Sequence, residues 1–531
     1  MQQQIKVIIL TDNLYIKKWV ADIVEYISTS PSYVISGVII NNATKKSKSS
    51  VAYKFLRLID RKIFKTKSNP FQTVLLPVKQ EIIINTIPIQ KEFSDWLDKD
   101  CLDQINNLQP DLILRFGFRI LRGDILKMPR LGVWSLHHGD NKVNRGGPPG
   151  FWEVVNQEII SGVTLQKITE DLDGGAVIGR AFIKSDLLSF HRNQVNLFET
   201  GVRLFQEQLN KLVEDKIVVE NTTFDFYNNF LYKDPSNIKA IKIAFIYFIR
   251  VLKRRFYTIV KQEQWIISHS KINNSEESIY RFKELVPPKG LNWADPFPMI
   301  FNNKLWLFVE EFKTNGLGKI ICFEYLNEKK IFANPKVCIE EKFHLSYPYI
   351  FNYENNIFMI PETGDFGNVI IYKSISFPYV WEKFNILIPN KKLYDVTPFQ
   401  FNGKWYCFAS ERSRESQSAN DLLNLYILEN GPLGSWKQHP SSPIKIDVRG
   451  GRSAGKIFEK QGKTYRPAQL GAPKYGYAIQ IYQIIKLDEN IYEELLVDSI
   501  LPKWKSNLVA THTYNQIDGW QFIDAQQTIS K

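Results

Sequence analysis

Residues 134–140 read Trp-Ser-Leu-His-His-Gly-Asp and open the stretch that decides the fold of the first half of this 531-residue chain. Asn-Arg-Gly-Gly-Pro-Pro-Gly-Phe-Trp-Glu follows at 144–153, Ser-Gly-Val-Thr-Leu at 161–165, and Asp-Leu-Asp-Gly-Gly-Ala-Val-Ile at 171–178. The first segment predicts a strand that ends at His137, the Gly/Pro segment a loop that opens a helix, and the Asp-Gly pair a tight turn. A histidine and a later carboxylate in this order indicate an acid–base site.

Strand and helix patterns alternate on both sides of this stretch. Strands are predicted for 5–10, 33–40, 110–114 and 133–136, and helices for 14–28 and 192–215. This alternation predicts a doubly wound α/β sheet of the Rossmann type, whose ligands bind at the carboxyl ends of the strands. Residues 45–70 are rich in Lys and Arg, and we expect them to form a long insertion or mobile loop.

The ordered series of motifs resembles the folate-dependent formyltransferases, which transfer a formyl group from N10-formyltetrahydrofolate to an amine. The catalytic His of this family corresponds to His137, and the Asp of its Leu-Asp-x-Gly turn corresponds to Asp173. The catalytic Asn corresponds to Ser135, whose hydroxyl is shorter than an amide. The resemblance covers residues 1–215 and implies a formyltransferase-like catalytic domain.

The resemblance also implies a role for each site residue. His137 would polarise the formyl oxygen, Asp173 would orient His137 and help to accept the amine proton, and Ser135 would be a substitute donor. His138 is a second imidazole that could compensate for the missing Asn. The folate-binding residues implied are Arg115, Phe116, Gly117, Leu136, Asp171 and Leu172, with the pterin passing along the backbone at Gly117. The alternative is an inactive domain in which His137 is structural and Asp173 is a turn residue.

Residues 216–284 are predicted to be a basic amphipathic linker. Between residues 238 and 261 apolar side chains recur at helical spacing among Lys and Arg, with no acidic neighbour. Such a helix can lie on an anionic membrane surface, or it can pack one domain on the other with a solvated basic face.

Short strands dominate from residue 285 to 531, and a weak repeat is present. Tight turns precede aromatic residues at 306, 358, 406, 465 and 520. Five strand–turn–strand units at such intervals predict an all-β propeller of five blades.

This half resembles the N-terminal domain of plant glucosamine inositolphosphorylceramide transferase, which is similar to five-bladed, arabinanase-like glycosidases. The resemblance is carried by residues 294–298, 310–312, 344–348, 359–363, 395, 452–455 and 466–469. Asp295, Glu362 and Asp395 come from three successive repeats, and paired carboxylates are what glycoside hydrolysis needs. Arg452 and Arg466 would suit a phosphate or carboxylate on a glycan. Binding, hydrolysis and a purely structural role all stay open.

Net charge, cysteine spacing and the distribution of apolar residues limit the ligands and the cellular location to be expected. The net charge of +13 suits anionic ligands. Cys101, Cys322, Cys338 and Cys407 are scattered, so neither a metal site nor a disulfide framework is indicated. No signal peptide or long apolar run is present, and we expect a cytoplasmic protein with contact to the inner face of the membrane through residues 238–261.

The sequence thus predicts a transferase that formylates the amine of a nucleotide- or lipid-linked amino sugar in surface glycan biosynthesis. N10-formyltetrahydrofolate would be its co-substrate, and nucleic acid is not an expected partner. The alternative function is a glycan-binding or glycan-acting propeller protein with an inactive formyltransferase-like domain.

Overall fold

The computed structural model describes residues 4–43, 49–78, 83–140, 142–143, 145–170, 175–215, 217, 230–271, 278–412 and 418–530. The chain forms two compact units, Met1–Val251 and Leu252–Lys531. Their boundary falls inside helix α6 (Asn237–Val260), ahead of the boundary at residue 285 expected from the sequence.

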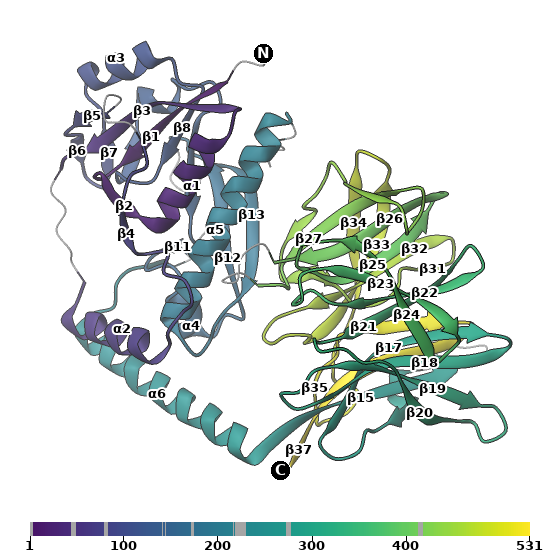
Figure 1. Ribbon diagram of the computed structural model, residues 1–531. Helices are drawn as coiled ribbons and strands as arrows, with labels where there is room; N and C mark the ends of the chain where they lie inside the picture. The colour runs from purple at the N-terminus through teal and green to yellow at the C-terminus, as the bar shows by residue number, and fades with distance from the viewer. Residues whose placement is uncertain are drawn as a thin grey trace. The chain divides into compact units, whose positions relative to one another are not determined.

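A seven-stranded mixed sheet forms the centre of the first unit (Figure 1). Its spatial order is β13 (Ala176–Lys184), β12 (Ile160–Lys167), β10 (Val133–His137), β8 (Leu112–Arg115), β1 (Ile5–Thr11), β3 (Tyr33–Asn41) and β5 (Ile83–Thr86). The strands from β10 to β5 run parallel, and β12 is antiparallel to both of its neighbours. The predicted α/β sheet is therefore confirmed, and β8 and β10 end at the same edge.

Helices cover both faces of this sheet because alternate side chains of its buried strands point to opposite sides. In β1, Ile8 and Leu10 pack with Ile105 of α3 (Lys99–Leu108), while Ile9 packs with Val24 of α1 (Lys18–Thr29). Helix α5 (Phe190–Val213) lies beside α1 and contacts β12 and β13. Short two- and three-stranded sheets are formed by β2 (Tyr15–Lys17) with β4 (Thr73–Leu75), β6 (Ile89–Lys91) with β7 (Ser94–Trp96) and β9 (Ile120–Arg122), and β11 (Arg145–Gly146) with β14 (Leu231–Tyr232).

The prediction of a mobile loop at residues 45–70 is wrong for residues 51–63. Val51–Ile63 form helix α2, whose N-terminus is capped by the Ser50 hydroxyl accepting a hydrogen bond from the Tyr53 backbone N–H. Buried residues of α2 pack with α4 (Trp152–Asn156) and α6 in a cluster that also contains Phe190. The density of Lys and Arg concealed the helical spacing of the residues that α2 buries.

The described residues of the second unit form five antiparallel sheets (Figure 1). Four of them follow the order of the chain, and the last three strands return to the sheet of the first two. The first sheet contains β17 (Leu291–Phe301), β18 (Lys304–Lys313), β19 (Lys319–Leu326) and β20 (Ile331–Ile339), and the second contains β21 (Ser346–Tyr353), β22 (Asn356–Glu362), β23 (Val369–Ser376) and β24 (Val380–Ile388). The third contains β25 (Leu393–Phe401), β26 (Lys404–Glu411), β27 (Leu422–Glu429), β28 (Ser435–Gln438) and β29 (Lys445–Ile446). The fourth contains β30 (Arg449–Ser453), β31 (Phe458–Lys460), β32 (Lys463–Leu470), β33 (Ala478–Leu487) and β34 (Tyr492–Ile500). The fifth contains β15 (Lys261–Lys271), β16 (Lys283–Leu285), β35 (Leu508–Ala510), β36 (Tyr514–Ile517) and β37 (Trp520–Ser530). Because β15 pairs with β37 along its whole length, the start and the end of this unit share one sheet.

The repeat seen in the sequence corresponds to one hairpin in each sheet. Each hairpin turn has two residues, and all ten turn residues have positive φ, as in type I′ turns. The turns are Asn302-Asn303, Glu354-Asn355, Asn402-Gly403, Gln461-Gly462 and Asp518-Gly519. This conformation favours Asn, Asp and Gly, which accounts for the recurring turn residues.

No helix among the described residues is both long enough and apolar enough to cross a membrane.

Candidate functional site

A cavity of about 750 Å³ lies at the edge of the first unit where β8 and β10 end. Parallel sheets commonly bind ligands at this edge. Its lining includes four residues predicted from the sequence, which are Arg115, Ser135, Leu136 and His137. The structure therefore brings the predicted residues of β8 and β10 together around one space.

Arg115 and Ser135 are joined by a hydrogen bond inside this cavity. Arg115 Nη1 donates to Ser135 Oγ at 2.7 Å, and Arg115 Nε donates to the carbonyl of Arg119 at 3.1 Å. The contact arises from strand register, because Leu114 of β8 lies opposite Trp134 of β10. As Ser135 Oγ accepts this bond, its own hydrogen is left to donate elsewhere.

His137 ends strand β10 and lies two residues after Ser135, on the same side of the strand. It lines the cavity, and its backbone position is opposite Thr164 of β12. Asp171, Leu172 and Asp173 lie outside the described residues, so the expected pairing of His137 with Asp173 has no structural account.

His138 does not enter the cavity. Its ring stacks on Phe198 with 3.7 Å between ring centroids, and its edge meets Trp19 at 5.1 Å. Burial and the neighbouring His137 lower the pKa of His138 to about 3, which keeps the ring neutral. The idea that His138 compensates for the missing Asn is therefore wrong, because alternation along the chain turns this ring toward α5.

Two of the predicted folate residues lie away from the cavity lining. The ring of Phe116 packs edge-on against Trp19 at 5.6 Å. Gly117 lies against the backbone of Thr11 and Asp12, where an added Cβ would come within 2.6 Å of the Asp12 nitrogen. Gly117 is thus needed for a close approach of two backbone segments. Three lining residues that the sequence analysis missed are Arg122, Gln166 and Lys233.

The second unit contains a cavity of about 640 Å³ lined by residues from all five sheets or the loops between their strands. Asp295, Glu362 and Arg452, predicted from separate repeats, all line it. Burial raises the pKa of Glu362 and raises that of Asp295 to about 7, although His512 opposes the second effect. A buried carboxyl with a raised pKa that lines a cavity is a candidate acid–base group.

Strand pairing is irregular at Asp295 and at the equivalent positions of the next two sheets. Asp295, Tyr347 and Asp395 have φ values of 51°, 43° and 48°, and each occupies a register shift near the start of the first strand of its sheet. Non-glycine residues rarely adopt positive φ within strands, and bulges of this kind re-aim side chains at functional sites.

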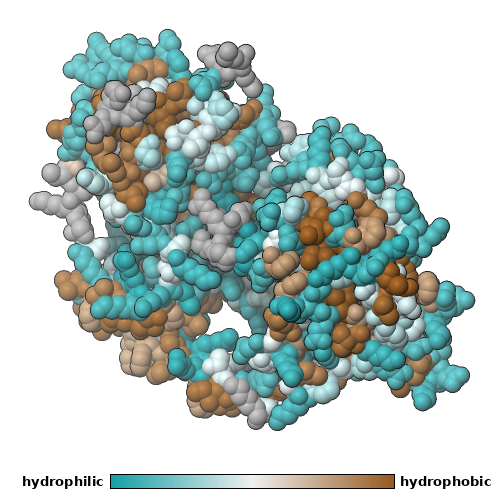
Figure 2. Space-filling model, in the orientation of Figure 1, coloured by the Kyte–Doolittle hydropathy of each residue, from teal (hydrophilic) through white to brown (hydrophobic). Residues whose placement is uncertain are grey.

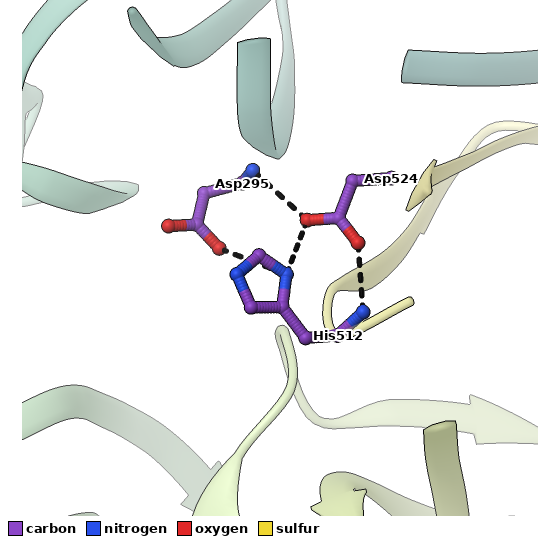
Figure 3. Close-up of side chains that lie close together, drawn as sticks. All are labelled: Asp295, His512 and Asp524. Atoms are coloured by element: carbon purple, nitrogen blue, oxygen red, sulfur yellow. Dashed lines mark hydrogen bonds and ion pairs between the residues drawn. The ribbon is translucent and has the colours of Figure 1, made fainter. Parts of the chain in front are cut away.

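Asp295 belongs to a buried cluster with His512 and Asp524 (Figure 3). His512 Nδ1 lies 2.5 Å from Asp524 Oδ2 and 3.9 Å from Asp295 Oδ1. Burial lowers the pKa of His512, but the two carboxylates outweigh it and raise the pKa to about 9. The second oxygen of Asp524 accepts hydrogen bonds from the backbone N–H groups of His512 and Thr513.

The same cluster offers three ligand atoms within 4.8 Å of one another, so it could hold a cation. The direct contact between His512 and Asp524 already neutralises part of the negative charge that a cation would need. We therefore describe it as an ion-pair network around Asp295.

Arg452 and Arg466, predicted as one anion-binding pair, lie in different surroundings. Arg452 donates to both carboxylate oxygens of Asp395 at 2.6 and 3.0 Å, and its guanidinium lies within 5.3 Å of the ring centres of Tyr394 and Tyr475. Arg466 is fully buried and donates two 2.8 Å bonds to Glu494, away from the cavity lining. Arg466 therefore does not line the cavity that Arg452 lines, because Glu494 of β34 holds its guanidinium inside their own sheet.

The sequence analysis also missed several residues of the second cavity. They include His344, Tyr394, Tyr475 and His512, together with the rings of Trp265 and Phe312. His344 accepts a hydrogen bond from the Gly318 N–H through Nδ1, and its Nε2 lies 3.1 Å from Glu310 Oε1. The only local feature of the sequence that marks His512 is the pair of Thr residues, Thr511 and Thr513, on either side of it.

Residues 288–528 match the family described as glucosamine inositolphosphorylceramide transferase 1, N-terminal. The chain is similar to different proteins in its two halves. Glucosamine inositolphosphorylceramide transferase 1 of Oryza sativa subsp. japonica is 32% identical over 240 residues, which cover 45% of this chain and 32% of that protein. The chain thus spans about a third of the length of the first curated relatives that it matches.

Formyltransferases are the relatives of the first half. Methionyl-tRNA formyltransferase of Clostridioides difficile (strain 630) is 33% identical over 175 residues, covering 32% of this chain and 55% of that protein. A solved N-formyltransferase from Helicobacter canadensis, in complex with folinic acid and dTDP-3-aminofucose, is 13% identical with a TM-score of 0.30. That likeness covers 61% of this chain and 100% of the other. A formyltransferase-like half and a second half with plant transferase relatives are therefore fused in one chain.

Proposed function

We propose that the first unit transfers a formyl group from N10-formyltetrahydrofolate to the amine of an amino sugar. The observation that carries this proposal is the hydrogen bond between Arg115 and Ser135 in the cavity that His137 also lines. A volume of about 750 Å³ is within the range of small-molecule and cofactor sites. Formyltransferase relatives of the same half support the reaction class.

The Arg115–Ser135 pair supplies what an Asn would supply in the related enzymes. Attack of the amine on the formyl carbon places negative charge on the formyl oxygen. Collapse of this intermediate breaks the bond between the formyl carbon and N10, so that tetrahydrofolate leaves with a proton on N10 and the sugar nitrogen, having lost a proton, keeps the formyl group. The Ser135 hydroxyl, oriented by its bond from Arg115, donates to that oxygen, and the guanidinium 2.7 Å behind it adds positive charge. A short hydroxyl thereby acts as an effective donor.

His137 is the group proposed to take part in proton transfer. Its place at the end of β10, on the same side as Ser135, puts an imidazole and an oxyanion donor on one wall. Asp173 would orient His137 and assist in accepting the amine proton, as the resemblance to the family implies.

The proposed acceptor is an amino sugar carried by a nucleotide or a lipid. The match of residues 288–528 to a family named for glucosamine transfer supports a sugar in preference to a tRNA. Within the first cavity, Arg122 and Lys233 offer positive charge for a phosphate-bearing carrier or for folate carboxylates.

A formyl-transfer assay tests this proposal. The full chain would be incubated with N10-formyltetrahydrofolate and a panel of nucleotide-linked amino sugars, and products would be identified by mass spectrometry. We expect one amino sugar to gain a formyl group and its hydroxyl analogue to remain unchanged. Absence of formylated product across the panel, with folate bound, would reject the amino-sugar acceptor.

The second unit supports another candidate function, glycan binding or cleavage by a chain whose formyltransferase-like half is inactive. We infer that its five sheets form the blades of a propeller around the cavity. The specific observation is that Asp295, with a pKa near 7, faces the same cavity as Glu362 and the aromatic rings of Trp265 and Tyr475. Carboxyl groups and aromatic walls suit sugar hydroxyls and sugar ring faces.

A Glu362→Gln variant separates the two candidates. Glu362 accepts hydrogen bonds from Ser346 Oγ and the Gly364 N–H, and the amide oxygen of Gln can keep one of these. If the second unit is the functional half, glycan binding measured by array or calorimetry is lost in this variant. If the first unit is functional, formyl transfer to a soluble amino sugar is the same in both proteins.

A further inference from the structure

Helix α6 has two apolar stripes on opposite sides, and only one of them is covered. The first stripe consists of Ala240, Ile243 and Tyr247, which are buried. The second is exposed and, within the first unit, recurs at steps of four and three residues through Ile241, Phe245 and Phe248. Phe245 exposes 67% of its surface. Contiguous exposed apolar side chains mark interaction surfaces, so the second stripe is a candidate docking surface.

Helix α2 shows the same arrangement. Tyr53, Leu56 and Asp60 are buried, while Val51, Phe55, Leu58 and Ile59 are exposed on the opposite side. Phe55 exposes 62% of its surface. Helix α2 and the part of α6 that belongs to the first unit therefore both present apolar side chains outward.

The two helices are held side by side by polar contacts. The Ala52 backbone N–H donates to Asn237 Oδ1 at 2.9 Å at one end, and Tyr247 Oη donates to Asp60 Oδ1 at 2.7 Å along the pair. Figure 2 shows brown, hydrophobic side chains over the place of α2 and the adjoining part of α6 in Figure 1. The outward stripes thus belong to one continuous face, which we call the α2–α6 face.

Positive charge surrounds this face. The sequence from residue 235 to 262 contains seven Lys or Arg and no Asp or Glu. Lys54, Lys62 and Lys242 are exposed beside the outward apolar residues. The acidic residue of α2, Asp60, is buried and accepts hydrogen bonds from Tyr247 and from the His191 backbone N–H. The acidic residue within α2 is therefore hidden from the surface, whereas the exposed Asp234, beside the N-terminal ends of both helices, accepts a hydrogen bond from Ser49.

We propose that the α2–α6 face binds the surface of an anionic membrane. Exposed Phe, Ile and Leu side chains would enter the boundary between headgroups and acyl chains, and the flanking Lys and Arg side chains would contact anionic headgroups. A second copy of the chain would place two strongly basic faces against each other, which charge repulsion opposes. Charge complementarity thus selects an anionic lipid surface as the occupant.

Vesicle co-sedimentation of the full chain tests this proposal. The vesicles would be phosphatidylcholine alone or phosphatidylcholine mixed with phosphatidylglycerol. We expect binding to the mixed vesicles that weakens as salt is raised, and at least tenfold weaker binding to phosphatidylcholine alone. Equal binding to both vesicles, or binding to neither, would overturn the proposal.

Two variants and one control locate the surface. Phe245→Ser/Phe248→Ser removes part of the apolar stripe, and Lys62→Glu/Lys242→Glu reverses two charges without touching the core. Each should weaken binding to mixed vesicles by roughly tenfold or more. Leu495→Ser/Val497→Ser changes exposed apolar residues of β34 and should leave binding unchanged. Thermal melts of all variants should match that of the parent, because the altered side chains are exposed.

The competing occupant gives a different result. If a second copy covers the face, the parent chain runs as a dimer in gel filtration, the Phe245→Ser/Phe248→Ser variant runs as a monomer, and neither binds vesicles. That outcome, like vesicle binding unaffected by both variants, would overturn the membrane proposal.

Discussion

Arg115 Nη1 donates a 2.7 Å hydrogen bond to Ser135 Oγ, and both residues line the cavity at the carboxyl ends of β8 and β10. This bond suggests how Ser135 can act at the position where the formyltransferases have a catalytic Asn. Ser135 alone is a short donor, but a serine that accepts from a guanidinium has its hydrogen directed away from that partner and its dipole strengthened. The pair is therefore the part of the first unit whose removal is most informative.

Ser135→Ala should lower kcat for formyl transfer by roughly 10²–10³ while changing KM little, because one oxyanion donor is lost. Arg115→Met should lower kcat by a similar factor, since Ser135 loses its orienting partner. The double variant should be no slower than the worse single variant, as expected for two residues acting as a unit. Steady-state kinetics on the four proteins completes the cycle.

Ser185→Ala is the matched control for this cycle. Ser185 is also buried in the first unit and bonds Ser161, but it lies outside the cavity lining. The kcat of the Ser185→Ala variant should equal that of the parent. Independent, multiplicative losses in the Arg115 and Ser135 variants would contradict a coupled pair.

His138 should make the first unit less stable as pH falls. Its folded pKa of about 3 lies below the unfolded value of about 6.5, so only the unfolded chain takes up a proton on this ring between those values. Stability is complete above pH 6.5 and is lost below it, by about 2 kcal/mol between pH 7 and pH 5. Replacing His138 with Phe keeps an aromatic ring against Phe198 and should remove this part of the loss.

Urea unfolding of the parent and the His138→Phe variant at pH 7 and pH 5 measures the effect. Carboxyl groups titrate in both proteins, so the difference between them isolates His138. Parallel changes in the two proteins would show that the ring is accessible to protons in the folded state.

His512 has the opposite pH dependence. Its folded pKa of about 9 is above the unfolded value, so its stabilising contribution is present below pH 6.5 and is lost as pH rises toward 9. The expected loss between pH 6 and pH 9 is about 3 kcal/mol. His512→Gln should cost about 3–5 kcal/mol at pH 6, because it leaves the buried Asp524 carboxylate without its ion-pair partner.

Calorimetry of the second unit's transition at the two pH values measures both quantities. The fall in stability between pH 6 and pH 9 should be smaller in the variant than in the parent, and the part that remains includes the titration of Asp295. A fall of equal size in both proteins would mean that His512 is not the titrating group.

Gly117→Ala should reduce stability without acting on the folate site directly. The new Cβ would lie 2.6 Å from the Asp12 nitrogen and 2.7 Å from the Thr11 carbonyl carbon, so backbone must move. We expect a cost of about 1–3 kcal/mol in urea unfolding. Ligand affinity per folded molecule should be unchanged, and a selective loss of folate affinity at full stability would place the pterin at Gly117 after all.

Local sequence predicted the elements that have strong periodicity or turn chemistry. The run at 5–10, the strand that ends at His137 and the five Asn- or Gly-containing hairpin turns are all present. These features depend on neighbours within a few residues, and so they can be recognised from one segment at a time.

Contacts between distant segments could not be predicted in this way. Arg115 meets Ser135 only because β8 and β10 pair in parallel, and Asp524 meets Asp295 across 229 positions because the two lie in neighbouring sheets. The helix at Val51–Ile63 was not predicted, because the Lys and Arg among its residues conceal the helical spacing of the three residues that it buries. Its outward face carries exposed apolar side chains. That face is the one for which we propose a membrane partner.

Titration of the full chain with 5-formyltetrahydrofolate, a stable relative of the proposed donor, tests the central claim most directly. Thermal unfolding of the first unit should shift upward, by about 2.7 kcal/mol of stabilisation at 100 times the dissociation constant. Ile120→Trp, which places a large ring in the cavity lining, should abolish the shift, whereas Ile159→Trp at an exposed site should retain it. No shift at millimolar ligand in the parent chain would contradict a folate site and leave the second unit as the functional half.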